Sequence, residues 1–255
     1  MNASLIIYVF GFLFGASWGS FLYTFIIRYT NGMYAKNALH ALTFPSHCPH
    51  CKAMIKPVYL IPIIGYLLTK GRCSGCGKPI SFLYPIAEIA SGCIAIASIY
   101  FFYWPLIPVY FIAVTTTICI AIIDTITMEI PDFLVGIFFL SGIIVCFIEG
   151  GWLAHIQGLA LMVVVFLVPL LIVKGGFGGG DVKFAGAIGF FLGLHETIVA
   201  LEIALVTGAL YGIGYAVLKS KTLKVHIPFG PFLTLGFVLA LMFGKDIIQI
   251  YLQML

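Results

Sequence analysis

Long apolar stretches separated by short polar segments make up most of this chain. They predict eight membrane crossings, at about 4–27, 83–103, 106–123, 133–148, 152–173, 183–194, 197–218 and 230–252. A crossing helix needs about 20 apolar residues to span a hydrocarbon core of about 30 Å. The sixth stretch is shorter and rises only about 18 Å. We therefore expect the sixth helix to be tilted, to lie in a thinned region or to be partly re-entrant.

The composition supports the same fold class. Of the 255 residues, 62% are hydrophobic and 9% are charged, whereas a soluble domain has about 25% charged residues. The first apolar stretch has no basic segment before it and no small-residue cleavage site after it, so we expect it to remain as a span. Together these features predict an all-α, polytopic helix bundle in the lipid bilayer.

Positive charge is concentrated in the segment 28–82. This segment has no acid and holds seven of the 13 Lys and Arg residues: Arg28, Lys36, Lys52, Lys56, Lys70, Arg72 and Lys78. Cytoplasmic loops carry such an excess, which places 28–82 on the cytoplasmic side. The loops on that same side then hold Lys174, Lys183, Lys219, Lys221 and Lys224. We interpret the charge as a topology signal and not as a nucleic-acid surface, and expect no nucleic-acid partner.

The pattern divides the chain into three parts. Residues 1–27 form the first span, 28–82 a basic cytoplasmic loop, and 83–255 a transmembrane core.

A glycine run stands where the fifth apolar stretch ends, in "VKGGFGGGDVKF" at 173–184. It contains Gly175, Gly176, Gly178, Gly179 and Gly180, and leads directly into Asp181. Glycine is unfavourable inside a helix, and a carboxylate is costly beside lipid. Glycines without side chains let a backbone approach an extended peptide closely and present its N–H and C=O groups to it. This function is expected of Gly178, Gly179 and Gly180.

Two acids are predicted at similar depth on the cytoplasmic side. Asp124 ends the third stretch and Asp181 begins the sixth. Two carboxylates that meet cannot both ionise easily, so one keeps a proton while the other is charged. Such a pair can activate water and protonate a leaving amine. The alternative for Asp181 is a helix cap, and the sequence does not favour either interpretation over the other. A capping role does not explain Asp124, because an acid at a helix C-terminus opposes the helix dipole.

Other charged residues near these two are weaker candidates. Asp132 fits the first turn of the fourth helix, where the dipole favours an acid, and Glu129 fits a solvated loop. Glu88 is either an interfacial acid or a polar contact inside the bundle that faces the loop or a substrate. Lys183 fits a snorkelling anchor and is also a candidate substrate contact.

Four cysteines in 28–82 predict a metal site. "CPHC" holds Cys48 and Cys51, and "CSGC" holds Cys73 and Cys76. Two such pairs complete a tetrahedral thiolate site typical of structural zinc, and the reducing cytoplasm disfavours disulfides. A redox pair is the minor alternative. His47 and His50 flank the site and are not needed as ligands.

Six motifs, in order, resemble those of the prepilin peptidases, or type IV leader peptidases, aspartic proteases of the bacterial inner membrane. "DTITMEIPD" resembles their first catalytic motif and "GGGDVK" their Gly-x-Gly-Asp motif. The other four are "GSFLYTFIIR", "KGRCSGC", "ISFLYPIAE" and "IPFGPFL". The chain departs from the family's usual residues at Tyr23, where Asn is common, and at Thr30, where Pro is common.

The resemblance implies a function. Asp124 and Asp181 would be the catalytic pair, and the substrates would be prepilins or pseudopilins with a short basic leader, cleaved at the cytoplasmic membrane face. Some members of the family also methylate the new N-terminus with S-adenosylmethionine, and the cysteine-bearing loop fits that larger form. The pathway served, whether pili, secretion or DNA uptake, is left open by the sequence.

Two other functions fit parts of the sequence. A presenilin-like protease shares the Gly-x-Gly-Asp pattern, but its Tyr-Asp pair is "ID" at Asp124. A proton-coupled carrier also uses intramembrane acids, yet no second glycine-broken span matches the first. "GASWG" at 15–19 matches a serine-hydrolase pattern but lies in a predicted membrane helix, where small residues serve packing.

Overall fold

The computed structural model describes residues 3–32, 46–172, 178–219 and 227–254. Throughout these ranges the regular elements are helices, which confirms the predicted fold class. Helix packing divides the chain into two compact units, Met1–Ile107 and Pro108–Leu255. Several residues named from the sequence lie outside the described ranges: Lys36, Lys174, Gly175, Gly176, Lys221 and Lys224.

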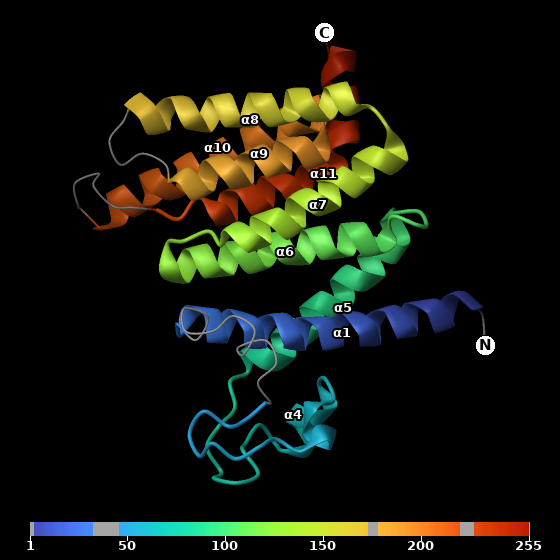
Figure 1. Ribbon diagram of the computed structural model, residues 1–255, viewed down its shortest axis with the longest axis vertical. Coiled ribbons are helices and arrows are strands. Elements are labelled where there is room, and N and C mark those ends of the chain that lie inside the picture. The colour runs from blue at the N-terminus through green and yellow to red at the C-terminus, as the bar shows by residue number, and fades with distance from the viewer. Residues whose placement is uncertain (1–2, 33–45, 173–177, 220–226, 255) are drawn as a thin grey trace. The chain divides into compact units, whose positions relative to one another are not determined.

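The first unit is built on two long helices, α1 (Ala3–Thr30) and α5 (Leu83–Phe101). They cross in close contact, as Figure 1 shows. A Cβ added to Gly15 would lie 2.6 Å from the Ser91 carbonyl oxygen, and one added to Gly19 would lie 2.5 Å from that of Ala87. The glycines of "GASWG" therefore serve helix packing.

Between these helices the chain forms a compact insertion. Its described part begins at Ser46 and includes a 3-10 helix, η1 (Pro57–Leu60), and a short helix, α4 (Ile64–Leu68). Two isolated antiparallel bridges, His47 with Met54 and Arg72 with Pro79, close the two segments that carry the cysteines.

The second unit is a six-helix bundle. Its helices are α6 (Ile107–Thr127), α7 (Asp132–Glu149), α8 (Trp152–Ile172), α9 (Gly179–Leu192), α10 (Leu194–Lys219) and α11 (Gly230–Met254). A cluster of aromatic rings fills its centre, where Phe138 contacts Phe184, Phe191 and Phe237 at centroid distances of 5.1 to 6.0 Å.

Helix α9 lies inside this bundle. It packs against α7, α8, α10 and α11 (Figure 1), and all eight residues from Phe184 to Phe191 are buried. A helix that is apolar on every side belongs in a core. Protein and not lipid surrounds α9, so it does not need the length of a lipid-exposed span.

Seven of the eight expected crossings correspond to helices that are long and apolar enough to span a membrane, among the described residues. The eighth is α9, which has 14 residues and is not one of these seven. Its predicted bounds, 183–194, were wrong: it starts four residues earlier, because Gly179, Gly180 and Asp181 form its first turn.

Packing also groups the spans in a way that the sequence did not indicate. α5 packs on α1 in the first unit, although topology alone had assigned residues 83–255 to one core. The functional division at residue 83 remains a prediction.

Candidate active site and metal centre

Asp124 lies in the last turn of α6 and is buried, with 4% of its surface exposed. The backbone N–H of Gly230, the first residue of α11, donates to its Oδ2 over 2.8 Å. The first N–H groups of a helix have no partner inside the helix and favour a negative charge. The N-terminus of α11 therefore compensates for the position of Asp124 at the end of its own helix.

The approach of these two residues requires glycine. A Cβ added to Gly230 would lie 2.7 Å from Asp124 Oδ2 and 3.2 Å from its Cβ. A second bond joins the same helices, because the Thr234 hydroxyl donates to the Thr117 carbonyl over 3.0 Å. Gly230 belongs to the motif "IPFGPFL", from which no role for it was predicted. The signal that could have indicated one is a glycine followed by proline at a helix start.

Asp181 is the third residue of α9 and is half-buried. Its Oδ2 accepts a hydrogen bond of 2.8 Å from the N–H of Gly178, the residue before the helix. This is the capping contact of the alternative interpretation. Gly180, the residue before Asp181, packs on Ile130 in the connection that follows α6, the helix of Asp124. The capping contact therefore does not exclude a catalytic role for Asp181.

The segments that carry the two aspartates meet at two further points. A Cβ on Gly180 would lie 3.0 Å from the Ile130 Cβ, so the glycine run packs on the α6–α7 connection. Lys183 forms an ion pair with Asp132, with its Nζ 2.8 Å from Oδ1. These contacts bring "DTITMEIPD" and "GGGDVK" together. A Cβ on Gly179, by contrast, would meet nothing within 4 Å.

The remaining candidates differ in their surroundings. Glu129 is exposed, and Asp132 and Lys183 are both exposed partners of one ion pair. Glu88 lies in the first unit, where it is buried and accepts a hydrogen bond of 2.7 Å from the Ile63 N–H. Glu88 therefore joins the insertion to α5. Of its two predicted roles, the structure shows the polar contact to the loop and not the solvated interfacial acid.

Comparison with known proteins shows the family of the chain. The bacterial peptidase A24 N-terminal domain model matches residues 13–102, and the type IV leader peptidase family model matches residues 111–213, which include both aspartates. A prepilin leader peptidase/N-methyltransferase of Bacillus subtilis (strain 168) is 35% identical over 248 residues, covering 95% of this chain and 97% of that protein. The chain belongs to the type IV leader peptidase family.

Other relatives agree. Proteins with the same name from Legionella pneumophila and Aeromonas hydrophila are 31% and 30% identical, each over 81% of this chain and over 75% and 74% of their own lengths. No solved structure matches the chain. These matches confirm the resemblance seen in the motifs: the chain is a multi-pass membrane enzyme of the prepilin leader peptidase/N-methyltransferase family.

The four cysteines of this family member form one cluster. All four Sγ atoms lie within 4.8 Å of one another, and the Cys48–Cys76 and Cys51–Cys73 sulfur pairs are each 3.9 Å apart. Four thiolates at a Zn–S distance of about 2.3 Å form a tetrahedron with edges of about 3.8 Å. The donor set and its spacing therefore fit zinc.

The backbone repeats itself around the two cysteine pairs. In each, the N–H of the first cysteine donates to the carbonyl five residues later, and the N–H four residues later donates back, over 2.8 to 2.9 Å. The residue at that return point has positive φ in both, 60° at Lys52 and 70° at Gly77. Backbone N–H groups of Cys51 and His50 lower the pKa of the Cys48 thiol to about 6. Those of Cys76 and Gly75 lower the pKa of Cys73, whereas burial and the neighbouring sulfurs raise the pKa of Cys76 to about 11. Thiolates are the form that binds zinc.

Replacing one of these cysteines is expected to remove the metal. The purified protein should contain one zinc per chain, measured by elemental mass spectrometry, and Cys76→Ser should lose most of it, because a site of three thiolates binds more weakly. The matched control is Cys93→Ser, an exposed cysteine of α5 outside the cluster. Full zinc in Cys76→Ser, or its loss in Cys93→Ser, would contradict this assignment.

Proposed function

We propose that this protein is an aspartic endopeptidase that removes the leader of type IV prepilins or pseudopilins at the cytoplasmic face of the bacterial inner membrane. The observation that carries the proposal is the packing of the segments that bear Asp124 and Asp181, where Gly180 lies against Ile130, together with the glycine N–H that binds each carboxylate. The basic insertion supports the orientation, because positive charge is retained on the cytoplasmic side.

In this mechanism the pair holds one proton. The charged aspartate removes a proton from a water molecule, whose oxygen attacks the carbonyl carbon of the peptide bond after the leader. The protonated aspartate hydrogen-bonds to the carbonyl oxygen and stabilises its developing charge. Collapse of the tetrahedral intermediate breaks the C–N bond as the amine receives a proton, and the pair returns to its single-proton state.

The glycine segment supports binding of an extended substrate beside the pair. Gly179 borders open space, so a peptide backbone can approach it closely. Gly180 and Gly178 are used by the protein itself, since Gly180 packs on Ile130 and Gly178 donates to Asp181. Lys183 forms an exposed ion pair with Asp132, and its role as a substrate contact remains a prediction.

The names of the relatives support a second reaction, methylation of the new N-terminus. S-adenosylmethionine supplies the methyl group in such a reaction. We assign zinc a structural role, because four thiolates occupy all four positions of a tetrahedral ion.

The experiment that tests the proposal is cleavage of a purified precursor pilin by purified wild-type protein and by Asp181→Asn, with both products identified by mass. A proton-coupled carrier would leave the precursor intact in every case. Cleavage that requires Asp181 supports the peptidase and excludes the carrier.

A further inference from the structure

The basic insertion contains a short apolar segment to which the peptidase mechanism gives no role. Residues 57–69, "PVYLIPIIGYLLT", have no charged side chain and form η1, a turn and α4. Lys56 stands directly before this segment, the 57–69 hairpin, and Lys70 stands directly after it. An apolar run of this length is typical of a helix in a protein core or of a segment that enters a membrane and returns.

The hairpin does not lie in a protein core within the described parts of the chain. None of the four residues of η1 is buried there, and Gly65 is the one buried residue of α4. Leu67 and Leu68 are 67% and 58% exposed. Four more apolar side chains of the hairpin are exposed: Val58, Leu60, Ile61 and Ile64. A continuous apolar surface of this kind marks contact with a partner or with a membrane.

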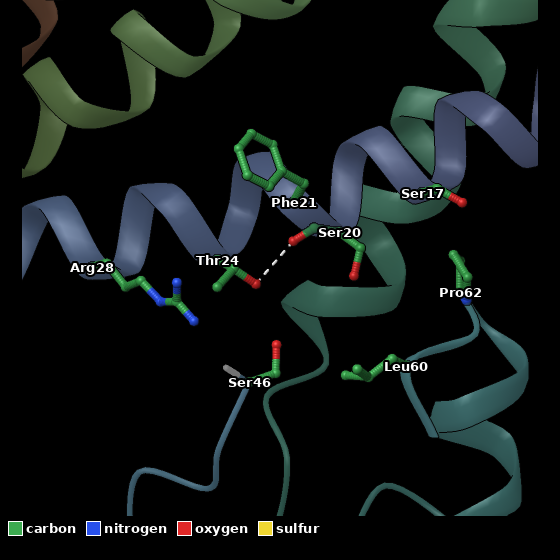
Figure 2. Close-up of a pocket in the computed structure, with 8 residues that line it drawn as sticks. All are labelled: Ser17, Ser20, Phe21, Thr24, Arg28, Ser46, Leu60 and Pro62. Atoms are coloured by element: carbon green, nitrogen blue, oxygen red, sulfur yellow. Dashed lines mark hydrogen bonds between the residues drawn. The ribbon is translucent and has the colours of Figure 1, made fainter. Parts of the chain in front are cut away.

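Contacts with α1 place the hairpin alongside a membrane span. One cavity is lined by Ser17 and Ser20 of α1 together with Leu60 and Pro62 of the hairpin. Figure 2 shows Leu60 below Ser20 and Pro62 below Ser17, with Arg28 at the other end of the row. Ser17 precedes Arg28 by 11 positions, which is a rise of about 16 Å along a helix. The hairpin therefore lies beside the interior of the span and not at its charged end.

A contact with α5 gives the same level. The carboxylate of Glu88, the sixth residue of α5, accepts the N–H of Ile63, which lies in the turn between η1 and α4. Glu88 is about 8 Å along the helix from its first residue. Since α5 has 19 residues, it needs nearly all of its length to cross a hydrocarbon core of about 30 Å. Measured on both helices, the Ile63 turn lies inside the hydrocarbon region.

Irregular backbone at this depth must have its polar groups satisfied by protein. Pro62 has no N–H, and the Ile63 N–H donates to the buried Glu88 over 2.7 Å. The Gly65 N–H donates to the Ile61 carbonyl over 2.8 Å. The N–H groups at the tip of the turn are thus paired within the protein. This gives a reason for a carboxylate that is buried early in a membrane helix, where an acid is otherwise costly.

We propose that the 57–69 hairpin is a re-entrant segment that enters the cytoplasmic leaflet of the bilayer and returns, with its exposed apolar side chains among the lipid tails. Lys56 and Lys70 then lie at the headgroups, where anionic lipids attract cations. The seven cations of 28–82, with no acid among them, complement such a surface. The apolar surface is also continuous with a span, because Tyr66 of α4 contacts the exposed Phe82, which leads directly into α5.

This placement changes the predicted topology of 28–82. The segment is then partly in lipid and not wholly in the cytoplasm, and the hairpin holds the zinc cluster at the membrane surface. The inference goes beyond the peptidase activity and does not depend on it.

Spin-label accessibility in proteoliposomes tests this placement. Leu67→Cys is made in a Cys93→Ser background, labelled with a nitroxide, and reconstituted into vesicles that contain anionic phospholipid. Molecular oxygen concentrates among lipid tails, whereas a polar nickel chelate stays in water. The rate at which each reagent collides with the nitroxide, measured by electron paramagnetic resonance, therefore reports the surroundings of residue 67.

Met54→Cys in the same background is the matched control. Met54 is an apolar residue of the insertion and is as exposed as Leu67, but it lies outside the hairpin and is bridged to His47 beside the zinc cluster. Zinc content reports folding of each labelled protein. If Leu67→Cys loses its zinc, the neighbouring exposed position, Leu68→Cys, takes its place.

The ratio of oxygen to nickel collisions is expected to be several times higher at Leu67 than at Met54. Equal ratios at the two positions would overturn the proposal. Infrequent collisions with both reagents at Leu67 would overturn it as well, because they would show that protein covers the hairpin, either a partner or another part of this chain.

Discussion

Replacing Asp124 by asparagine is expected to lower kcat for precursor cleavage by at least about 1000-fold. Asparagine has the same shape and keeps an oxygen that can accept the Gly230 N–H bond. It cannot take up or release the shared proton, however, and acid–base catalysis contributes about 10² to 10⁴ in rate. Because the two aspartates act as one unit, the loss of either should remove most of this. Initial rates with a purified precursor pilin measure the effect.

The control for Asp124 is Asp132→Asn. Asp132 lies in the first turn of the next helix and forms an exposed ion pair with Lys183. Such pairs contribute about 0 to 1 kcal/mol, so its kcat should fall by less than about tenfold. Near wild-type cleavage by Asp124→Asn, with Asp132→Asn inactive, would move the catalytic role to Asp132.

Gly230→Ala is expected to lower kcat about 10- to 100-fold, although Gly230 carries no side chain and is far from Asp124 in sequence. The added Cβ would lie 2.7 Å from Asp124 Oδ2, closer than real contacts allow. Either the carboxylate rotates away or the start of α11 shifts, and both disturb the hydrogen bond that orients it. A displacement of about 1 Å at a reacting group can cost about 10²-fold in rate.

Gly136→Ala is the matched control for this substitution. Gly136 lies on the exposed side of α7, and a Cβ there meets nothing within 4 Å. Alanine is the better helix former, so this variant should cleave at the wild-type rate and be as stable or more so. If Gly230→Ala cleaves as fast as Gly136→Ala, then the α11 N-terminus does not position Asp124.

The helical architecture was readable from the sequence because lipid imposes simple requirements. A span must be apolar over about 20 residues and must satisfy its backbone hydrogen bonds internally. Apolar runs such as 152–173 can therefore be recognised as spans from the sequence. The cysteine cluster was readable for a similar reason, since the spacing of Cys48, Cys51, Cys73 and Cys76 is local and metal geometry is strict. Asp124 and Asp181 stood out because acids are rare in this chain.

The tertiary contacts between helices could not be predicted from the sequence pattern. The hydrogen bond from Gly230 to Asp124 joins residues 106 positions apart. The hydrophobic pattern of a sequence does not predict contacts between residues so far apart. The bounds of α9 were misplaced because its first turn consists of glycines and an aspartate, which count against a helix in any apolar pattern. Its burial by four neighbouring helices overrides that preference. The hydrogen bond between Glu88 and Ile63 depends on the positive φ of Ile63, and a β-branched residue gives no indication of such a backbone conformation.

The most direct test of the central claim is the rate at which purified Asp181→Asn cleaves a precursor pilin in proteoliposomes, with wild type beside it. Asp181 caps α9 by accepting the Gly178 N–H bond, and the proposed mechanism gives it a second role as the partner of Asp124. Asparagine preserves the cap, since its amide oxygen can accept the same N–H bond, but cannot share a proton. If the aspartates form a catalytic pair, Asp181→Asn folds, retains its zinc and leaves the precursor uncut while wild type releases the leader. If Asp181→Asn cleaves at close to the wild-type rate, Asp181 is a cap alone and the proposed mechanism is wrong.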